Sequence, residues 1–345
     1  MVDANQIPLR RSLMYSALII FVLVLLAEGA AQLCLWKMYR GRLEPWERLH
    51  EYDSLLGWRN LKSHHVPNRY GPGNNATHNL DGFRAETEYT RVVPPGRYRI
   101  LFLGDSFTYG VDADDKDTFP SQMETLCPAI EAVNMGVAGY GIDQFYLRYQ
   151  AQGKELDANL VLFAFIEDDF ARMKMSVFQA SYPKPQLIAD GGAIKSVNVP
   201  VPAWGDAALT GWLEGFPNRL ALVRVLRKVS DTYINNYPVF PMAERVFNAM
   251  NAQCQGANRR FALVYLPSKI DFERSAPTEA ARKVGQIAER LHIPLINLTD
   301  AFRARAPELA GLFRPDGGHY SKPGYRLVAA ELLKGLRREL PVVPR

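Results

Sequence analysis

The feature that most constrains the fold is a series of short apolar runs that alternate with amphipathic stretches from residue 98 onwards. The apolar runs predict the strands Tyr98–Leu103, Glu131–Met135, Leu160–Ile166, Phe261–Leu266 and Leu295–Leu298. The amphipathic stretches predict the helices Pro120–Leu126, Asp143–Glu155, Arg219–Ile234, Pro241–Gln255, Thr278–Leu291 and Pro323–Arg338. Continuously apolar strands that alternate with helices are typical of a parallel sheet covered on both faces. The chain is therefore predicted to form an α/β domain over residues 98–340.

Two segments depart from this alternation. Residues 37–97 are mixed and rich in turn residues, which predicts an irregular connecting segment with short strands. Residues 171–216 form an insertion after the third predicted strand. Its stretch KPQLIADGGAIKSVNVPVP predicts a β-hairpin that turns at Asp190-Gly191-Gly192. Such an insertion either forms one wall of a site or is a decoration of the fold.

The N-terminus contains a long apolar run. After a tail of residues 1–12, residues 13–36 would rise about 36 Å as a helix, which is enough to cross a bilayer. Glu28 is costly at mid-bilayer unless it reaches the interface or a protein partner. A single-pass membrane anchor, a cleaved signal peptide ending near Gly29-Ala30-Ala31 and a buried helix are the three interpretations. Basic residues flank both ends, so charge does not fix the orientation. The large domain is expected on the extracytoplasmic, periplasmic side.

Composition excludes several classes of function. The formal net charge is +5 with no block of Lys or Arg, so no nucleic-acid partner is expected. The three cysteines and six histidines show no zinc-binding spacing, and neither a metal nor a cofactor is expected. Cys127 and Cys254 are either paired or free. The aspartates at positions 112, 114, 115 and 117 are interrupted by Lys116 and read as a solvated loop.

Small and polar residues follow four of the predicted strands. Gly104-Asp105-Ser106 ends the first strand, NMGVAGYG (residues 134–141) follows the second, and FAFIEDDF (residues 163–170) closes the third. The stretch RPDGGHYSKPGY (residues 314–325) lies between the last strand and the last helix. Because the carboxyl ends of parallel strands share one edge of a sheet, all four stretches are expected to converge there.

These stretches resemble the sequence blocks of the SGNH hydrolase superfamily, the GDSL-type esterases and acyltransferases. The first block matches Gly104-Asp105-Ser106, the second matches Asn134 through Gly139, and the last, Asp-x-x-His, matches Asp316-Gly317-Gly318-His319. The resemblance covers about residues 98–338. It implies a flavodoxin-like three-layer sandwich with a parallel sheet. The stretches DSLLGWR and NLDGFR also resemble, more weakly, membrane-anchored members of this superfamily.

The resemblance also implies a role for each matched residue. Ser106 takes the nucleophile role, His319 the role of its base, and Asp316 the role of the carboxylate that orients His319. The backbone N–H groups of Ser106 and Gly139 take the oxyanion role. This assignment is chemically reasonable, because a serine hydroxyl becomes a good nucleophile only when an oriented base takes its proton.

One position departs from the superfamily pattern. The third block carries an Asn that donates to the oxyanion, and Asp168 stands there in this chain. An ionised carboxylate cannot donate, and loss of one such donor costs about 2.7–4 kcal/mol of transition-state stabilisation. Burial of Asp168 beside Glu167 and Asp169 would favour its protonated form.

Two functions follow as hypotheses. The first is a membrane-anchored serine esterase or O-acyltransferase acting on an acylated small molecule or glycan of the cell envelope. The second is a non-catalytic relative that binds a polysaccharide or a protein partner in the same cleft, and Asp168 is the residue that supports it.

Overall fold

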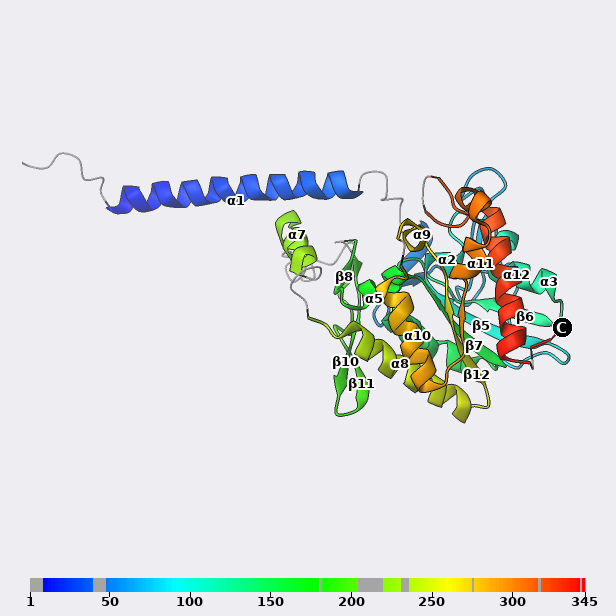
Figure 1. The fold of residues 1–345 in the computed structure, drawn as a ribbon. Helices are drawn as coiled ribbons and strands as arrows, with labels where there is room; N and C mark the ends of the chain where they lie inside the picture. The colour runs from blue at the N-terminus through cyan, green and yellow to red at the C-terminus, as the bar shows by residue number, and fades with distance from the viewer. Residues whose placement is uncertain are drawn as a thin grey trace, which may run out of the picture.

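A parallel sheet of five strands forms the centre of the computed structural model (Figure 1). The structure describes residues 9–39, 48–179, 182–203, 220–230, 236–274, 276–315, 318–341 and 343–344. The strands lie in the order β13-β12-β7-β5-β6, and every neighbouring pair is parallel. Their bounds are β5 (Tyr98–Gly104), β6 (Ile130–Asn134), β7 (Leu160–Phe165), β12 (Arg260–Tyr265) and β13 (Leu295–Asn297). These are the five predicted strands, shifted by one residue at most ends.

The strand order is that of a flavodoxin-like fold. In order of appearance along the chain the strands stand as 2-1-3-4-5 across the sheet. The order reverses between β5 and β7, which are hydrogen-bonded neighbours. In such sheets ligands bind beyond the carboxyl ends of the strands at this reversal. The predicted fold class is therefore confirmed, and the residues after β5 and β7 lie where a site is expected.

Alternate strand residues point to opposite faces, and each face has its own core. Leu101, Phe163 and Leu263 belong to one buried cluster, whereas Phe102, Leu162 and Val264 belong to the other. Helices α4 (Ile142–Ala151), α8 (Val239–Gly256) and α10 (Glu279–Leu291) cover the first face. Helices α3 (Phe119–Leu126) and α12 (Lys322–Glu339) cover the second (Figure 1). Cys127 and Cys254 belong to clusters on opposite faces, so the sheet separates them and they form no disulfide with each other.

Short helices that the sequence pattern did not predict lie at the edges of this core. They are α2 (Ser106–Tyr109), α5 (Glu167–Met173), α9 (Ile270–Glu273) and α11 (Thr299–Arg303). Each has between four and seven residues, which is too short to show a helical period in the sequence. Two of them, α2 and α5, begin directly after strands β5 and β7, where the site is expected.

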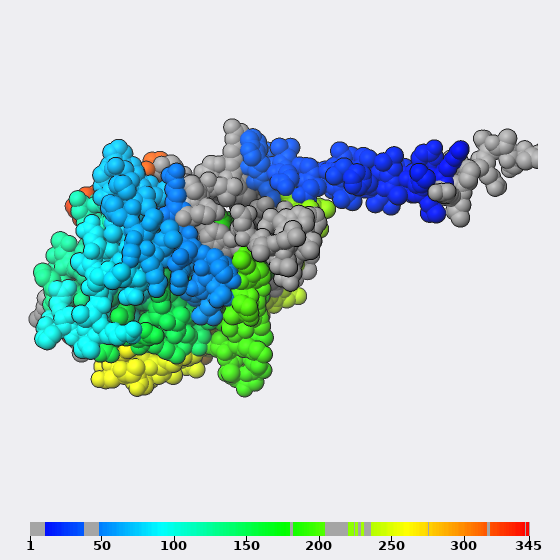
Figure 2. Space-filling model, turned by 180° about the vertical axis from the view of Figure 1, so that it is seen from behind, coloured from blue at the N-terminus to red at the C-terminus, as the bar shows by residue number. Residues whose placement is uncertain are grey.

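The segment before the sheet contains two small antiparallel hairpins. Strands β1 (His50–Asp53) and β2 (Gly57–Asn60) form one, and β3 (His64–Val66) and β4 (Ala76–His78) form the other. The indole of Trp58 is fully buried and donates to the carbonyl of Ala138 at 3.0 Å. The Asn60 amide donates to the carbonyl of Gly136 at 3.1 Å. The segment therefore packs on the turn that follows β6 and covers a broad face of the domain (Figure 2).

The insertion after β7 begins with a two-residue pair of strands, β8 (Val177–Phe178) and β9 (Tyr182–Pro183). The hairpin of β10 (Gln186–Asp190) and β11 (Ala193–Val197) follows and turns at the predicted position, since Asp190 pairs with Ala193. A buried ion pair ties the insertion to the domain. The ammonium of Lys184 binds the carboxylate of Asp143 at the start of α4, and both side chains are fully buried. The rest of the insertion, residues 180–181 and 204–216, lies outside the described residues.

The N-terminal helix α1 (Leu9–Tyr39) projects from the domain as a rod (Figures 1 and 2). Residues Arg11–Lys37 form the one helix in the described ranges that is long and apolar enough to cross a membrane. Only 11% of its apolar window is buried, unlike the core helix of a globular domain. The helix alone does not distinguish an anchor from a signal sequence.

The carboxylate of Glu28 on α1 binds a distant segment of the same chain. Its two carboxylate oxygens accept hydrogen bonds from the backbone N–H groups of Ala221 and Leu222 at 2.7 and 2.9 Å. These residues begin helix α7 (Ala221–Val229). Helix α7 lies within the predicted helix Arg219–Ile234. A carboxylate at a helix N-terminus satisfies unpaired N–H groups and the helix dipole. This contact reduces the cost of an acidic residue in an apolar helix.

Candidate active site

Ser106 lies at the turn from β5 into α2. The turn is tight, because a Cβ atom on Gly104 would come within 2.0 Å of the Thr108 hydroxyl and 2.6 Å of the Ala164 carbonyl. Asp105 caps α2 by accepting from the N–H of Phe107 at 2.9 Å. Each residue of Gly104-Asp105-Ser106 therefore has its own local role. Gly104 allows close packing, Asp105 caps the helix, and Ser106 places a hydroxyl at the edge of the sheet. Ser106 remains 8% exposed.

The imidazole of His319 reaches Ser106 from the far end of the chain. Its Nε2 lies 3.0 Å from Ser106 Oγ, and the competing contact of that oxygen with Asp105 Oδ2 is longer, at 3.3 Å. The ring packs on Phe107 with 5.0 Å between ring centroids. The backbone next to it is fixed, because Arg314 N–H donates to the His319 carbonyl at 2.7 Å. The structure therefore brings together the predicted serine and histidine, which are 213 residues apart.

Among the described residues, the carboxylate that lies beside His319 is that of Asp112. Its Oδ2 lies 3.4 Å from His319 Nδ1. Asp316, the residue expected in this role, lies outside the described residues. Asp112 was missed because it belongs to an acidic run, and sequence does not show which member of such a run turns inward. A second expectation for this run is wrong: Asp114, Asp115 and Asp117 are buried, and they bind the β3–β4 hairpin, Arg84 and Lys322 rather than water alone.

Two backbone N–H groups lie free at this edge. Neither the N–H of Ser106 nor that of Gly139 donates a hydrogen bond within the described part of the chain. Gly139 has φ of +81°, and a Cβ atom there would lie 2.6 Å from the ring of Phe178. A glycine is therefore required both by conformation and by space. Free N–H groups at the ends of neighbouring strands can stabilise an oxyanion.

Asp168 is the second residue of α5, and its side chain is exposed. The expectation that it is buried is therefore wrong. The carboxylate that is buried is the next one, Asp169, which is fully enclosed. It accepts from the N–H of Ile166 at 3.0 Å and binds Arg172. Burial raises the pKa of Asp169 well above its usual value, the charge of Asp105 raises it further, and Arg172 opposes both effects.

Glu167 is the third acidic residue at the start of α5. It is half-buried, and its Oε2 makes no hydrogen bond within the described ranges. Burial raises the pKa of Glu167, and the guanidinium of Arg274, 3.9 Å away, opposes that effect. Three carboxylates thus begin one helix in three environments, exposed, half-buried and enclosed. Sequence alone does not separate them.

Metal binding finds no support at these positions. Within the described residues, no group of three or more His, Cys, Asp or Glu side chains could hold a metal ion. His78 is buried between the hydroxyl of Tyr109 at 2.8 Å and the carbonyl of Leu61 at 2.9 Å. Burial lowers the pKa of His78 well below its usual value, with a further contribution from Arg84. It is therefore a neutral structural histidine.

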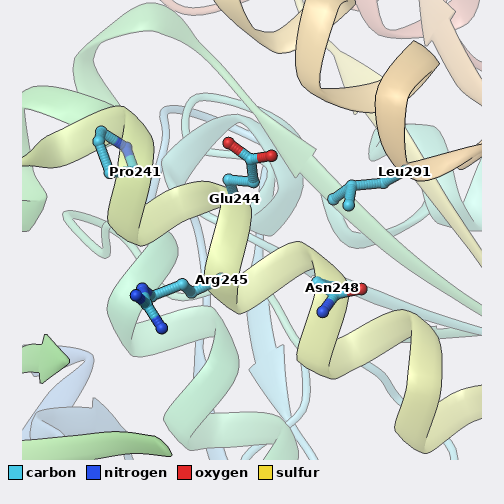
Figure 3. A pocket seen from close by; sticks show the side chains of 5 residues that line it. All are labelled: Pro241, Glu244, Arg245, Asn248 and Leu291. Carbon is cyan, nitrogen blue, oxygen red and sulfur yellow. The ribbon is translucent and has the colours of Figure 1, made fainter. Parts of the chain in front are cut away.

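A hollow of about 340 Å³ opens between α8 and α10 (Figure 3). It is lined by Pro241, Glu244, Arg245, Asn248 and Leu291. Arg290 already binds Glu244 with hydrogen bonds of 2.7 and 2.9 Å. Neither Ser106 nor His319 lines this hollow, so it is not the candidate active site.

No curated protein matches the chain. Solved structures that resemble it include a member of the lipolytic G-D-S-L family from Veillonella parvula, at 13% identity over 69% of this chain and 97% of the other, with a TM-score of 0.41. The acetyl xylan esterase AlAXEase matches at 14% identity over 69% and 99% of the two chains, with a TM-score of 0.44.

The match to a protein family is more specific. The model of the GDSL-like lipase/acylhydrolase family matches residues 102–327. This segment contains the end of β5, the other four strands of the sheet, Ser106 and His319. It covers more than half of the chain, and the chain therefore belongs to the GDSL-like lipase/acylhydrolase family.

Proposed function

We propose that the protein is a membrane-anchored serine esterase or O-acyltransferase in which Ser106 is the nucleophile and His319 its base. The observation that carries this proposal is the 3.0 Å contact between Ser106 Oγ and His319 Nε2. A nucleophile and a base within hydrogen-bond reach, with the base oriented by a third group, is the geometry that activates a serine hydroxyl.

The reaction proceeds in two halves. His319 Nε2 takes the hydroxyl proton while Ser106 Oγ attacks the acyl carbon of an ester, and the carbonyl oxygen becomes an oxyanion. The N–H groups of Ser106 and Gly139 stabilise that charge. The protonated His319 then gives its proton to the departing alcohol, leaving an acyl-serine. Water or a second alcohol attacks the acyl-serine by the same steps, which gives hydrolysis or transfer.

Two further assignments belong to the proposal. Asp316 orients His319 through the Asp-x-x-His spacing, and Asp168 stands beside the oxyanion at the end of β7. Because Asp168 is exposed, the two N–H groups are the main donors to the oxyanion, and Asp168 donates only when it is protonated.

The substrate is proposed to be an acylated molecule of the cell envelope, a glycan in particular. The support is the exposed apolar helix α1, which would hold the domain at a membrane and place the site among envelope molecules. An extracytoplasmic, periplasmic domain follows if α1 is an anchor with its N-terminus inside.

Labelling with a fluorophosphonate tests the proposed function, because this reagent reacts with activated serines. The full-length protein in detergent micelles should be labelled, and Ser106→Ala should not. Ser268→Ala is the matched control: Ser268 follows β12 at the same sheet edge, and its hydroxyl binds Asp271 at 3.2 Å. That variant should be labelled like the wild type. Absence of labelling in all three proteins would favour a non-catalytic binding protein.

A further inference from the structure

The strongest unexplained feature of the site is the second nitrogen of His319. His319 Nδ1 is buried and makes no hydrogen bond within the described part of the chain. Asp112 Oδ2 lies 3.4 Å away, which is an ion-pair distance without hydrogen-bond geometry. Catalytic hydrogen bonds are often long in the absence of substrate and shorten in the substrate complex. The gap between these two atoms is therefore compatible with a working contact.

The backbone around Asp112 turns its side chain inward. Gly110 and Asp112 both have positive φ, +89° and +67°, and the N–H of Ala113 donates to the Gly110 carbonyl at 3.2 Å. Aspartate and asparagine are among the few side chains that adopt this conformation without large strain. The loop of residues 110–113 thus requires a glycine at its first position and favours an aspartate at its third.

Two buried side chains hold this loop in place. The guanidinium of Arg84 donates to the Ala113 carbonyl at 2.9 Å and is itself paired with Asp115 at 2.5 Å. The hydroxyl of Tyr325 on α12 donates to the Val111 carbonyl at 2.9 Å. The backbone on both sides of Asp112 is therefore anchored, one side by the segment before the sheet and the other by the last helix. A loop fixed at both ends positions its side chain with little freedom.

The carboxylate of Asp112 also acts electrostatically on its surroundings. Tyr325 is fully buried, burial raises its pKa well above the usual value, and the negative charge of Asp112 raises it further. The side chains of Asp112 and His319 are 24% and 22% exposed, so water screens their interaction only in part. An ionised Asp112 therefore favours a proton on the nitrogen of His319 that faces it.

We propose that Asp112 is a positioning residue that holds the proton of neutral His319 on Nδ1, so that Nε2 can accept the proton of Ser106. This inference rests on the proposed function, because it assigns Asp112 to the same reaction. Asp112 shares this task with Asp316. The loop of residues 110–113 therefore belongs to the site.

The tautomer of His319 provides a test that does not depend on turnover. ¹⁵N chemical shifts of histidine-labelled full-length protein in micelles distinguish a proton on Nδ1 from one on Nε2, and His319→Ala identifies the signal. Asp112→Asn keeps the backbone conformation but offers an amide N–H to Nδ1, which favours the wrong tautomer. We expect the proton on Nδ1 in the wild type and a shift towards Nε2 in Asp112→Asn. Asp300→Asn removes an exposed carboxylate elsewhere and should leave the signal unchanged.

Kinetics on p-nitrophenyl acetate provide the second measurement. Asp112→Asn should lower kcat by about 100-fold or more with KM changed less than about two-fold, because the residue acts through the base. Asp112→Glu should recover part of kcat, which a purely structural role would not predict. Should Asp112→Asn fail to fold, Asp112→Glu is compared with the wild type: the proton should stay mainly on Nδ1, because the carboxylate is kept, and kcat should fall by less than about 100-fold, because the carboxylate is displaced. A proton mainly on Nε2 in Asp112→Glu, or an unchanged kcat, would contradict the role of Asp112.

The outcomes separate the two proposals. An unchanged tautomer in Asp112→Asn, with a changed tautomer in Asp316→Asn, overturns the role of Asp112. Unchanged tautomers in both variants overturn it as well. If the wild type is not labelled by the fluorophosphonate but Asp112→Asn still changes the tautomer, the proposed function fails, and only the effect of Asp112 on the His319 tautomer stands.

Discussion

Two polar clusters lie side by side at the carboxyl edge of the sheet and differ in how completely their groups are bonded. The closed cluster consists of Asp105, Asp169 and Arg172. Arg172 donates to Asp105 at 3.1 Å, to the Tyr140 carbonyl at 3.0 Å, and also to Asp169. The open cluster consists of Ser106, His319 and Asp112. Its groups are partly exposed, and His319 Nδ1 makes no hydrogen bond within the described residues.

How completely a polar group is bonded distinguishes a structural role from a chemical one, even for residues that are adjacent in sequence. Asp105 and Ser106 are adjacent, yet Asp105 is fully buried and bonded on both oxygens, while Ser106 faces a base. A saturated buried network stabilises the fold but has no free group for a substrate. An unsaturated cluster contributes less to stability and keeps groups available for reaction. The two clusters should therefore respond in opposite ways to substitution.

The largest expected effect is on stability in the closed cluster. Arg172→Met leaves two buried carboxylates without their cation, and we expect a loss of about 3–5 kcal/mol in the free energy of unfolding. Burial already raises the pKa of Asp169 above its unfolded value, and loss of the Arg172 cation raises it further. The variant is therefore most stable below the unfolded value near pH 4 and loses stability as the pH rises towards the folded value.

Denaturant unfolding at several pH values measures this effect. Arg59→Met is the matched control, because Arg59 pairs with Glu51 at 2.8 Å but is 35% exposed, and such pairs contribute less than about 1 kcal/mol. Ser106→Ala, in the open cluster, should also unfold like the wild type. If Ser106→Ala destabilises the protein as much as Arg172→Met does, the distinction between the two clusters is wrong.

A second prediction concerns the oxyanion glycine. Gly139→Ala forces a side chain into a positive φ and into the ring of Phe178, so the N–H group should move away from its position. We expect kcat to fall by about 100-fold or more, which is the effect of losing one oxyanion donor. Steady-state kinetics on p-nitrophenyl acetate measure it.

The double variant Gly139→Ala/Phe178→Ala separates backbone strain at residue 139 from the collision with the Phe178 ring. Removing the ring relieves the collision but not the backbone strain, so the double variant should recover only part of the activity. Full activity in Gly139→Ala would remove its N–H group from the oxyanion site.

The sequence predicted the architecture well because the sheet is buried on both faces. Strand β7 is wholly apolar, and β5 and β12 each contain a single arginine at or next to the start of the strand, so the apolar runs are easy to recognise. The glycine pair after Asp190 identifies the β10–β11 hairpin. The short helices α2 and α5 were not predicted, because four to seven residues do not show a period.

The sequence predicted only part of the site, because some of its residues are placed by contacts between distant segments. Ser106 and His319 stand in recognisable blocks, whereas the inward position of Asp112 depends on Arg84 and Tyr325, which lie 28 residues before and 213 after it in the sequence. The exposure of Asp168 and burial of Asp169 depend likewise on where α5 begins. Such long-range contacts leave no local signal.

The smallest expected effect is that of Asp168→Asn, which tests whether the open cluster extends to the end of β7. An ionised carboxylate near the oxyanion opposes its charge, whereas an amide can donate to it. Because Asp168 is exposed, the gain is limited to about 1 kcal/mol, or about five-fold in kcat/KM. The same substitution removes a negative charge from the first turn of α5 and should cost at most about 1 kcal/mol of stability. Asp300→Asn is the control, because Asp300 is also an exposed second residue of a short helix. It should lose similar stability with no change in kcat/KM. A loss of activity in Asp168→Asn at every pH would show that the carboxylate itself assists the reaction and that Asp168 does not stand in for the amide donor of the family.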